Sequence, residues 1–85
     1  MMHYTLATED KNREGIRSIL DQYFEGYSLT PCQGRWKGQH EDGLTISIVG
    51  NVDPNTIQQA AEEIKAVNQQ DAVMVIASPC ELTLI

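Results

Sequence analysis

Two apolar stripes with helical spacing lie among short segments of strand-like alternation, and this order constrains the fold more than any other feature. The first stripe has members at positions i, i+3, i+4, i+7 and i+8: Ile16, Ile19, Leu20, Tyr23 and Phe24. The second has the same helical spacing: Ile57, Ala60, Ala61, Ile64 and Val67. Each stripe predicts an amphipathic helix that buries a single face.

Residues at the helix ends support these two helices. Asp53 and Pro54 predict the start of the second helix, because an N-cap carboxylate is followed by a proline whose missing amide hydrogen is not needed there. For the first helix we expect Thr8 or Asp10 as the N-cap and Gly26 as a left-handed C-terminal cap.

Four segments have the composition or the alternation of β-strands: His3–Thr8, Tyr27–Trp36, Leu44–Val49 and Ala72–Ala77. Pro31 and Gly34 predict an edge position and a bend for the second strand. Polar Gly38–Gly43 is predicted to be a turn. The apolar segment Ala72–Ala77 predicts a strand that is buried on both faces, or on one face and at an interface.

The resulting order is strand, helix, strand, strand, helix, strand. At 85 residues the chain is predicted to be one domain, residues 1–85. Right-handed crossovers then predict a ferredoxin-like α+β sandwich, in which a four-stranded antiparallel sheet has its first and third strands in the centre and both helices on one face. The other face is left free, so we expect a homo-oligomer that associates through the sheet.

The segment Glu81–Ile85 resumes a strand-like alternation after Ser78-Pro79. Its apolar residues are unusual so near a terminus, where polar residues are the rule. Two alternatives are open: this tail adds a fifth strand to its own sheet, or it pairs with a neighbouring subunit. Leu82, Leu84 and Ile85 are therefore the predicted oligomer-interface residues.

The segment Gln33–Gly43 contains the only tryptophan, between two cations, with three glycines and a histidine. Trp36 offers a stacking face, while Arg35 and Lys37 could hold a phosphate or a carboxylate. With His40, these residues form the predicted binding site for a small anionic ligand or nucleotide. The alternative is a twisted edge hairpin, in which Trp36 packs on the sheet and the two cations protect the edge from aggregation.

Other chemistries are disfavoured. Net charge is −6 and the six basic residues are scattered, which works against binding to a nucleic acid duplex. No apolar run is long enough for a membrane span, and the first residues lack a secretory signal, so a cytoplasmic location is expected. His3 and His40 have no inferable nucleophile partner, and His40-Glu41-Asp42 has no metal-ligand spacing. We expect no enzymatic activity, cofactor or metal.

The cysteines are too few for a disulfide framework. Cys32 and Cys80 are predicted to be buried free thiols. A single bridge between them is the alternative, and strands at opposite edges of the sheet would forbid it.

The combination of Gly34-Arg35-Trp36 with Gln70-Asp71-Ala72-Val73 resembles small uncharacterised bacterial and phage proteins. That resemblance implies a fold and an origin in mobile elements. In strand order the chain also resembles amino-acid-sensing regulatory domains and the nitrogen-signalling trimers. The trimers bind ligands with the loop between the second and third strands, the place that Gln33–Gly43 occupies here.

Two hypotheses for function follow. The first is a non-catalytic binding module that self-associates through its sheet and takes a small anionic ligand or a protein partner. The alternative is a small acidic inhibitor or adaptor of a phage or mobile element, which covers a basic surface of a host protein. Its affinity would fall steeply with ionic strength.

Overall fold

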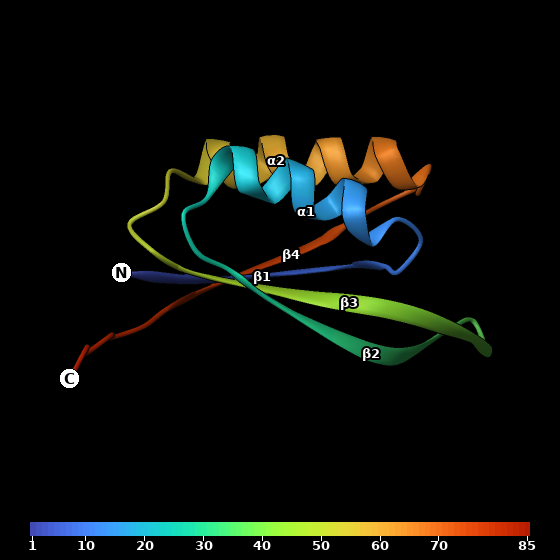
Figure 1. Cartoon of the computed structure of the whole chain (residues 1–85). Helices are drawn as coiled ribbons and strands as arrows, with labels where there is room; N and C mark the ends of the chain where they lie inside the picture. Colours follow the sequence, from blue (N-terminus) through green and yellow to red (C-terminus); the bar gives the residue numbers. More distant parts are fainter.

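The computed structural model describes residues 1–85 and contains four strands and two helices in the predicted order. The elements are β1 (Met2–Glu9), α1 (Arg13–Tyr23), β2 (Ser28–Trp36), β3 (Gln39–Gly50), α2 (Pro54–Asn68) and β4 (Met74–Pro79). The strands form one antiparallel sheet in the order β2-β3-β1-β4, and both helices cover the same face (Figure 1). The predicted ferredoxin-like sandwich is confirmed.

The core lies between the helices and the sheet. It consists of Tyr4, Leu6, Ile16, Leu20, Phe24, Leu44, Ile46, Ile48, Ile57, Ala60, Ala61 and Ile64. The two central strands, β1 and β3, contribute every second residue and each helix contributes its stripe, whereas the edge strands β2 and β4 contribute none of the twelve. The predicted faces of β1, β3 and the two helices are therefore confirmed, with one exception in α2.

That exception is the last turn of α2. Val67 is 39% exposed, although it was predicted to belong to the stripe, whereas Asn68 is only 4% exposed. Asn68 follows Ile64 by four residues and so lies on the buried face as well. The predicted start of α2 is confirmed, because the Asp53 carboxylate accepts a 2.8 Å hydrogen bond from the backbone N–H of Asn55 and Pro54 is the first helical residue.

Both predicted ends of α1 are wrong. The N-cap is Asn12, whose side-chain oxygen accepts a 3.0 Å hydrogen bond from the backbone N–H of Gly15. At the other end the helix stops in Phe24, which is extended at φ −133°, and Gly26 has no positive φ. The chain leaves the helix without a left-handed cap because Phe24 turns back into the core, where it is 7% exposed.

The predicted turn at Gly38–Gly43 is also wrong. β3 begins at Gln39, and the connection to β2 is the two-residue turn Lys37-Gly38. Both turn residues have positive φ (50° and 76°), which is the pattern of a type I′ turn and fits the twist of a hairpin. Polar residues can lie in these strands because this end of the hairpin extends beyond the helices and has no core to cover (Figure 1).

The last strand lies at an edge. β4 pairs only with β1, so the predicted burial on both faces is wrong, and Met74, Val75 and Ile76 are 59%, 43% and 48% exposed. The tail beyond β4 forms no fifth strand on its own sheet and extends away from the domain (Figure 1). Of the two alternatives for the tail, pairing with a neighbouring subunit stays a prediction.

Both cysteines are free, but they are not buried as predicted. Cys32 is exposed on β2 and Cys80 is half-buried just after β4. Because β2 and β4 are opposite edges of the sheet, with β3 and β1 between them, a bridge within one chain is excluded.

Candidate functional site

All four predicted ligand-binding residues lie at the free end of the β2–β3 hairpin. Arg35 is paired across the hairpin with His40, and Trp36 is paired with Gln39. Lys37 is the first residue of the turn itself. The hairpin therefore brings the predicted residues together, but as the arms of a narrow ribbon and not as a loop.

The ribbon divides these residues between its two sides, because residues that face each other in an antiparallel pair point to the same side. Arg35 and His40 share the side on which the helices lie. Trp36 lies on the opposite side. A ligand that contacts both Trp36 and Arg35 must therefore wrap around the tip or the edge of β2.

Existing contacts occupy part of this site. The guanidinium of Arg35 donates a 2.7 Å hydrogen bond to the carbonyl oxygen of Gly38, which closes the turn. His40 Nε2 lies 3.0 Å from Asp42 Oδ1, two residues further along the same strand. Lys37 Nζ lies 5.8 Å from the centre of the Trp36 ring, within cation–π range.

The two cations of the hairpin differ from those at the start of α1. There, Lys11 is paired with Glu9 at 3.1 Å and Arg13 with Asp10 at 2.6 Å. Arg35 and Lys37 have no carboxylate partner in the structure. Their charge is therefore free to meet an anion.

Trp36 is 64% exposed, although tryptophan is normally well buried. The alternative in which its ring packs on the sheet is therefore wrong for the single chain. A large exposed ring beside two unpaired cations can stack on a flat group and can equally pack against a partner subunit. At least one glycine of this segment has a packing role. A Cβ at Gly43 would lie 3.1 Å from Cys32 Sγ, so a side chain there would crowd the neighbouring strand.

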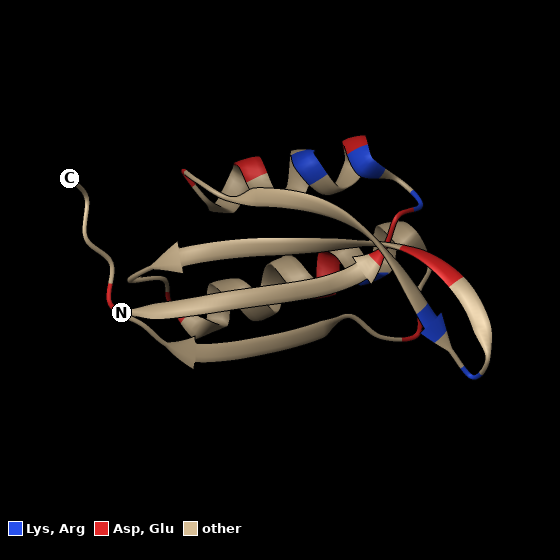
Figure 2. Cartoon of the chain, turned by 90° about the horizontal axis from the view of Figure 1, so that it is seen from below, with Lys and Arg blue, Asp and Glu red and all other residues tan.

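The open face of the sheet is a second candidate site. Its central rows run across all four strands, and their members follow from the strand pairing: Ser28, Ser47, Thr5 and Ile76 in one row, Thr30, Thr45, Ala7 and Met74 in the next. His3 flanks the first row, and its Nε2 lies 2.7 Å from Ser47 Oγ. Figure 2 shows that Lys, Arg, Asp and Glu are absent from the middle of this face.

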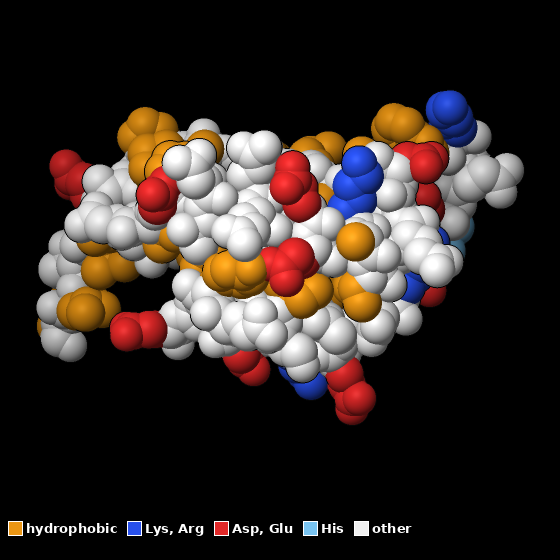
Figure 3. All heavy atoms as spheres, turned by 90° about the horizontal axis from the view of Figure 1, so that it is seen from above, with side chains coloured by type: hydrophobic (Ala, Val, Ile, Leu, Met, Phe, Trp, Pro, Cys, Tyr) orange, Lys and Arg blue, Asp and Glu red, His pale blue; other side chains and the backbone are white.

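The helix side of the molecule has the opposite character. Figure 3 shows acidic side chains spread over it with fewer basic ones among them. With twelve acidic and six basic residues in the chain, an uncharged sheet face is a marked local departure from the composition. Depletion of charge is typical of the buried centre of an interface.

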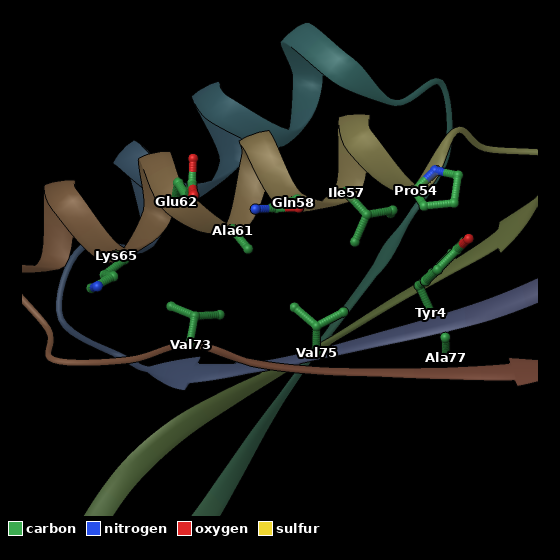
Figure 4. A pocket seen from close by; sticks show the side chains of 10 residues that line it. All are labelled: Tyr4, Pro54, Ile57, Gln58, Ala61, Glu62, Lys65, Val73, Val75 and Ala77. Carbon is green, nitrogen blue, oxygen red and sulfur yellow. The ribbon is translucent and has the colours of Figure 1, made fainter.

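A third feature is a groove of about 460 Å³ between α2 and β4. Figure 4 shows Ile57 and Ala61 pointing into it from α2, and Val73, Val75 and Ala77 from β4 and the residues before it. Lys65 and Glu62 lie at its rim, and Tyr4 and Pro54 close one end. Sequence reasoning missed this groove, because it depends on the distance between a helix and an edge strand.

A buried polar cluster at the end of α2 was missed as well. The Asn68 amide nitrogen donates to the carbonyl oxygen of Glu9 at 2.9 Å and to the hydroxyl of Thr8 at 3.1 Å. Gln70 completes the cluster by accepting from the Thr8 hydroxyl. The helical phase of Asn68 was the available signal for this cluster, which ties the end of α2 to the end of β1.

The structure contains no group of three His, Cys, Asp or Glu side chains that could hold a metal ion. Neither helix has the length and apolar character that crossing a membrane would need.

No protein-family model matches the sequence, and no curated protein matches it. Solved structures do match. One is CPII, a nitrogen regulatory PII-like protein from Thiomonas intermedia K12 bound to ADP, AMP and bicarbonate, with a TM-score of 0.70 and 13% identity over 99% of this chain and 93% of that chain. Another is a duf3240 family protein from Shewanella baltica OS155, with a TM-score of 0.65 and 11% identity over the same shares of the two chains.

At these identities the likeness shows the fold. It agrees with the resemblance in strand order to nitrogen-signalling proteins, and both matches extend over almost the whole chain. Both proteins are bacterial, and neither supports an origin in a phage or mobile element or the acidic adaptor hypothesis.

Proposed function

We propose that this protein is a non-catalytic binding module of the PII-like kind, which self-associates through the open face of its sheet and takes a small anionic ligand at the β2–β3 hairpin. The observation that carries the proposal is the uncharged open face of an otherwise acidic protein. Burying this face against another copy desolvates no Lys, Arg, Asp or Glu side chain in its central rows. His3 and Ser47, which contact each other, lose little on burial.

The proposed ligand belongs to the adenine nucleotide class. Three features support this: an exposed tryptophan ring that can stack on a base, two cations without carboxylate partners for phosphate, and a fold shared with a protein whose structure holds ADP and AMP. Because Arg35 and Trp36 lie on opposite sides of one ribbon, a second subunit would complete the site. Ligand binding is therefore proposed to depend on assembly.

Light scattering coupled to size exclusion tests self-association. We expect the wild-type chain to elute as a multimer, and Thr5→Asp to be a folded monomer because it places a charge at the centre of the open face. Ser18→Asp adds the same charge to an exposed position on α1 and should leave the mass unchanged. A wild-type chain that is monomeric at every concentration, or a multimeric Thr5→Asp, would refute the proposal.

Trp36 is the only tryptophan, so its fluorescence reports on the hairpin directly. Titration with ADP and AMP should change the emission of the wild-type chain and should have a much weaker effect on Arg35→Ala. Lys11→Ala removes a cation that is already paired with Glu9 and serves as the control. Identical titrations for wild type and Arg35→Ala would remove the hairpin from the ligand site.

A further inference from the structure

The free edge of β4 has backbone groups available for another strand. The N–H of Cys80 donates to the carbonyl oxygen of Met1 at 3.0 Å, so the even-numbered residues of β4 point their backbone groups toward β1. Val75 and Ala77 alternate with these residues, so their backbone N–H and C=O groups point away from β1, to the side where no strand lies. The backbone of Pro79 also faces away from β1, where its missing N–H costs no hydrogen bond to β1, as expected of a proline in an edge strand.

The same two residues also line the groove. The side chains of Val75 and Ala77 form its floor, and Ile57 and Ala61 of α2 lie above them (Figure 4). The groove is open on the side where the sheet stops at β4. A strand added here would hydrogen-bond to Val75 and Ala77 and place every second side chain on the helix side of the sheet, at the open side of the groove.

The tail has the pattern that this position requires. Leu82 and Leu84 alternate with Thr83, so an extended tail presents two leucines on one side. The two leucines are 43% and 90% exposed, so both have apolar surface that a partner can cover. Strand addition to a sheet edge uses this combination of main-chain bonds and alternate side-chain pockets.

We propose that Glu81–Ile85 of a second copy adds to the free edge of β4 and places Leu82 and Leu84 in the groove under α2. This rests on the proposed self-association and names the segment and the groove that take part in it. The segment comes from a second copy because the chain's own tail leads away from the groove: the Cys80–Met1 hydrogen bond holds its start in line with β4 (Figure 1). To enter its own groove, the tail would have to break that bond and reverse direction.

Amide hydrogen exchange at Val75 and Ala77 tests the proposal. In the wild-type chain these two amides should become more protected as protein concentration rises. The double variant Leu82→Asp/Leu84→Asp should lose this dependence, whereas Thr83→Asp, whose side chain points away from the groove, should keep it. The tail is exposed, so none of these variants should unfold the domain.

A mixing experiment identifies the donor of the strand. Isotope-labelled chain lacking residues 81–85 should show unprotected Val75 and Ala77 amides. Unlabelled Ala77→Phe, which has an intact tail but a filled groove, should restore their protection when added. If the added chain fails to restore protection while the wild type is protected, the strand comes from the chain's own tail and the proposal is overturned.

Amide exchange and the mass of the multimer together distinguish docking of the tail from association through the open face. If the double variant keeps both the wild-type mass and the wild-type exchange, docking of the tail is refuted and association through the open face stands. If the wild-type chain is monomeric, both are refuted.

Discussion

The hydroxyl of Tyr23 on α1 donates a hydrogen bond to the carboxylate of Glu63 on α2, and this is a side-chain tie between the two helices. The carboxylate holds the hydroxyl proton, so the hydrogen bond to Glu63 raises the pKa of Tyr23 above its ordinary value, with a smaller contribution from burial. A tyrosine whose pKa is raised in the folded chain stabilises the fold fully below its unfolded pKa of about 10 and loses that contribution as pH rises through the folded value.

Tyr23→Phe should therefore lower the melting temperature at neutral pH. The difference from wild type should begin to shrink above about pH 10, where the hydroxyl ionises in the unfolded chain but is still protonated in the folded one. Melting curves recorded from pH 7 to pH 11 check this. Tyr27→Phe is a useful comparison, because the hydrogen bond to Asp21 raises the pKa of Tyr27 in the same direction. A constant difference across the range would contradict the role given to the Tyr23–Glu63 bond.

Replacing the side chains of two nearby residues at the end of α2 by alanine should lower the unfolding free energy by different amounts. Ile64 is fully buried, so Ile64→Ala should cost about 2–5 kcal/mol of unfolding free energy. Val67→Ala should cost about 0.5 kcal/mol or less, because Val67 lies outside the core. Urea unfolding of the two variants measures both values. Equal losses would mean that the stripe of α2 includes Val67 after all.

Asn68 should be sensitive to loss of its donor group. Asn68→Ala leaves the Glu9 carbonyl and the Thr8 hydroxyl short of a partner and should cost about 1–3 kcal/mol. Asn68→Asp should cost more at neutral pH than at pH 4, since a buried carboxylate both lacks the donor and resists ionisation. Unfolding curves at the two pH values distinguish this from a simple change of volume. Insensitivity of the Asp variant to pH would argue against burial.

Substitutions in the hairpin turn should affect stability and ligand binding differently. Gly38→Ala should destabilise by roughly 1–2 kcal/mol, because φ is +76° there. Lys37→Asn should raise the melting temperature, since Asn-Gly suits a type I′ turn better than Lys-Gly. The same variant removes a cation next to Trp36, so nucleotide binding should weaken while stability increases. If Lys37→Asn weakens nucleotide binding and also lowers the melting temperature, Lys37 contributes to the stability of the turn.

Much of the fold could be predicted from the sequence because the helix stripes and the alternation of β1 and β3 are local patterns with different periods. The start of α2 was equally local, since Asp53-Pro54 acts within one turn of helix. The ends of α1 were not predicted, because Thr8 is drawn into the sheet and Phe24 into the core, and both effects depend on residues distant in sequence.

The candidate site was predicted in part. The grouping of Arg35, Trp36, Lys37 and His40 needed only their nearness in the chain, but their division between two sides of a ribbon needed the register of β2 and β3. Polar residues at Gln39–Gly43 suggested a turn, whereas cross-strand pairing with β2 makes them a strand. The strand propensity of single residues does not include the backbone hydrogen bonds that two segments form with each other.

The sequence alone determined which elements form, their order and which side of β1, β3 and each helix is apolar, because those properties arise from neighbours within a few residues. Only the tertiary structure decided that β4 is an exposed edge, that a groove opens beneath α2, and that the open face carries no charge in its centre. These features depend on how distant segments are placed in space. A strand of Val, Met and Ile has the same residues whether it ends a sheet or fills its middle.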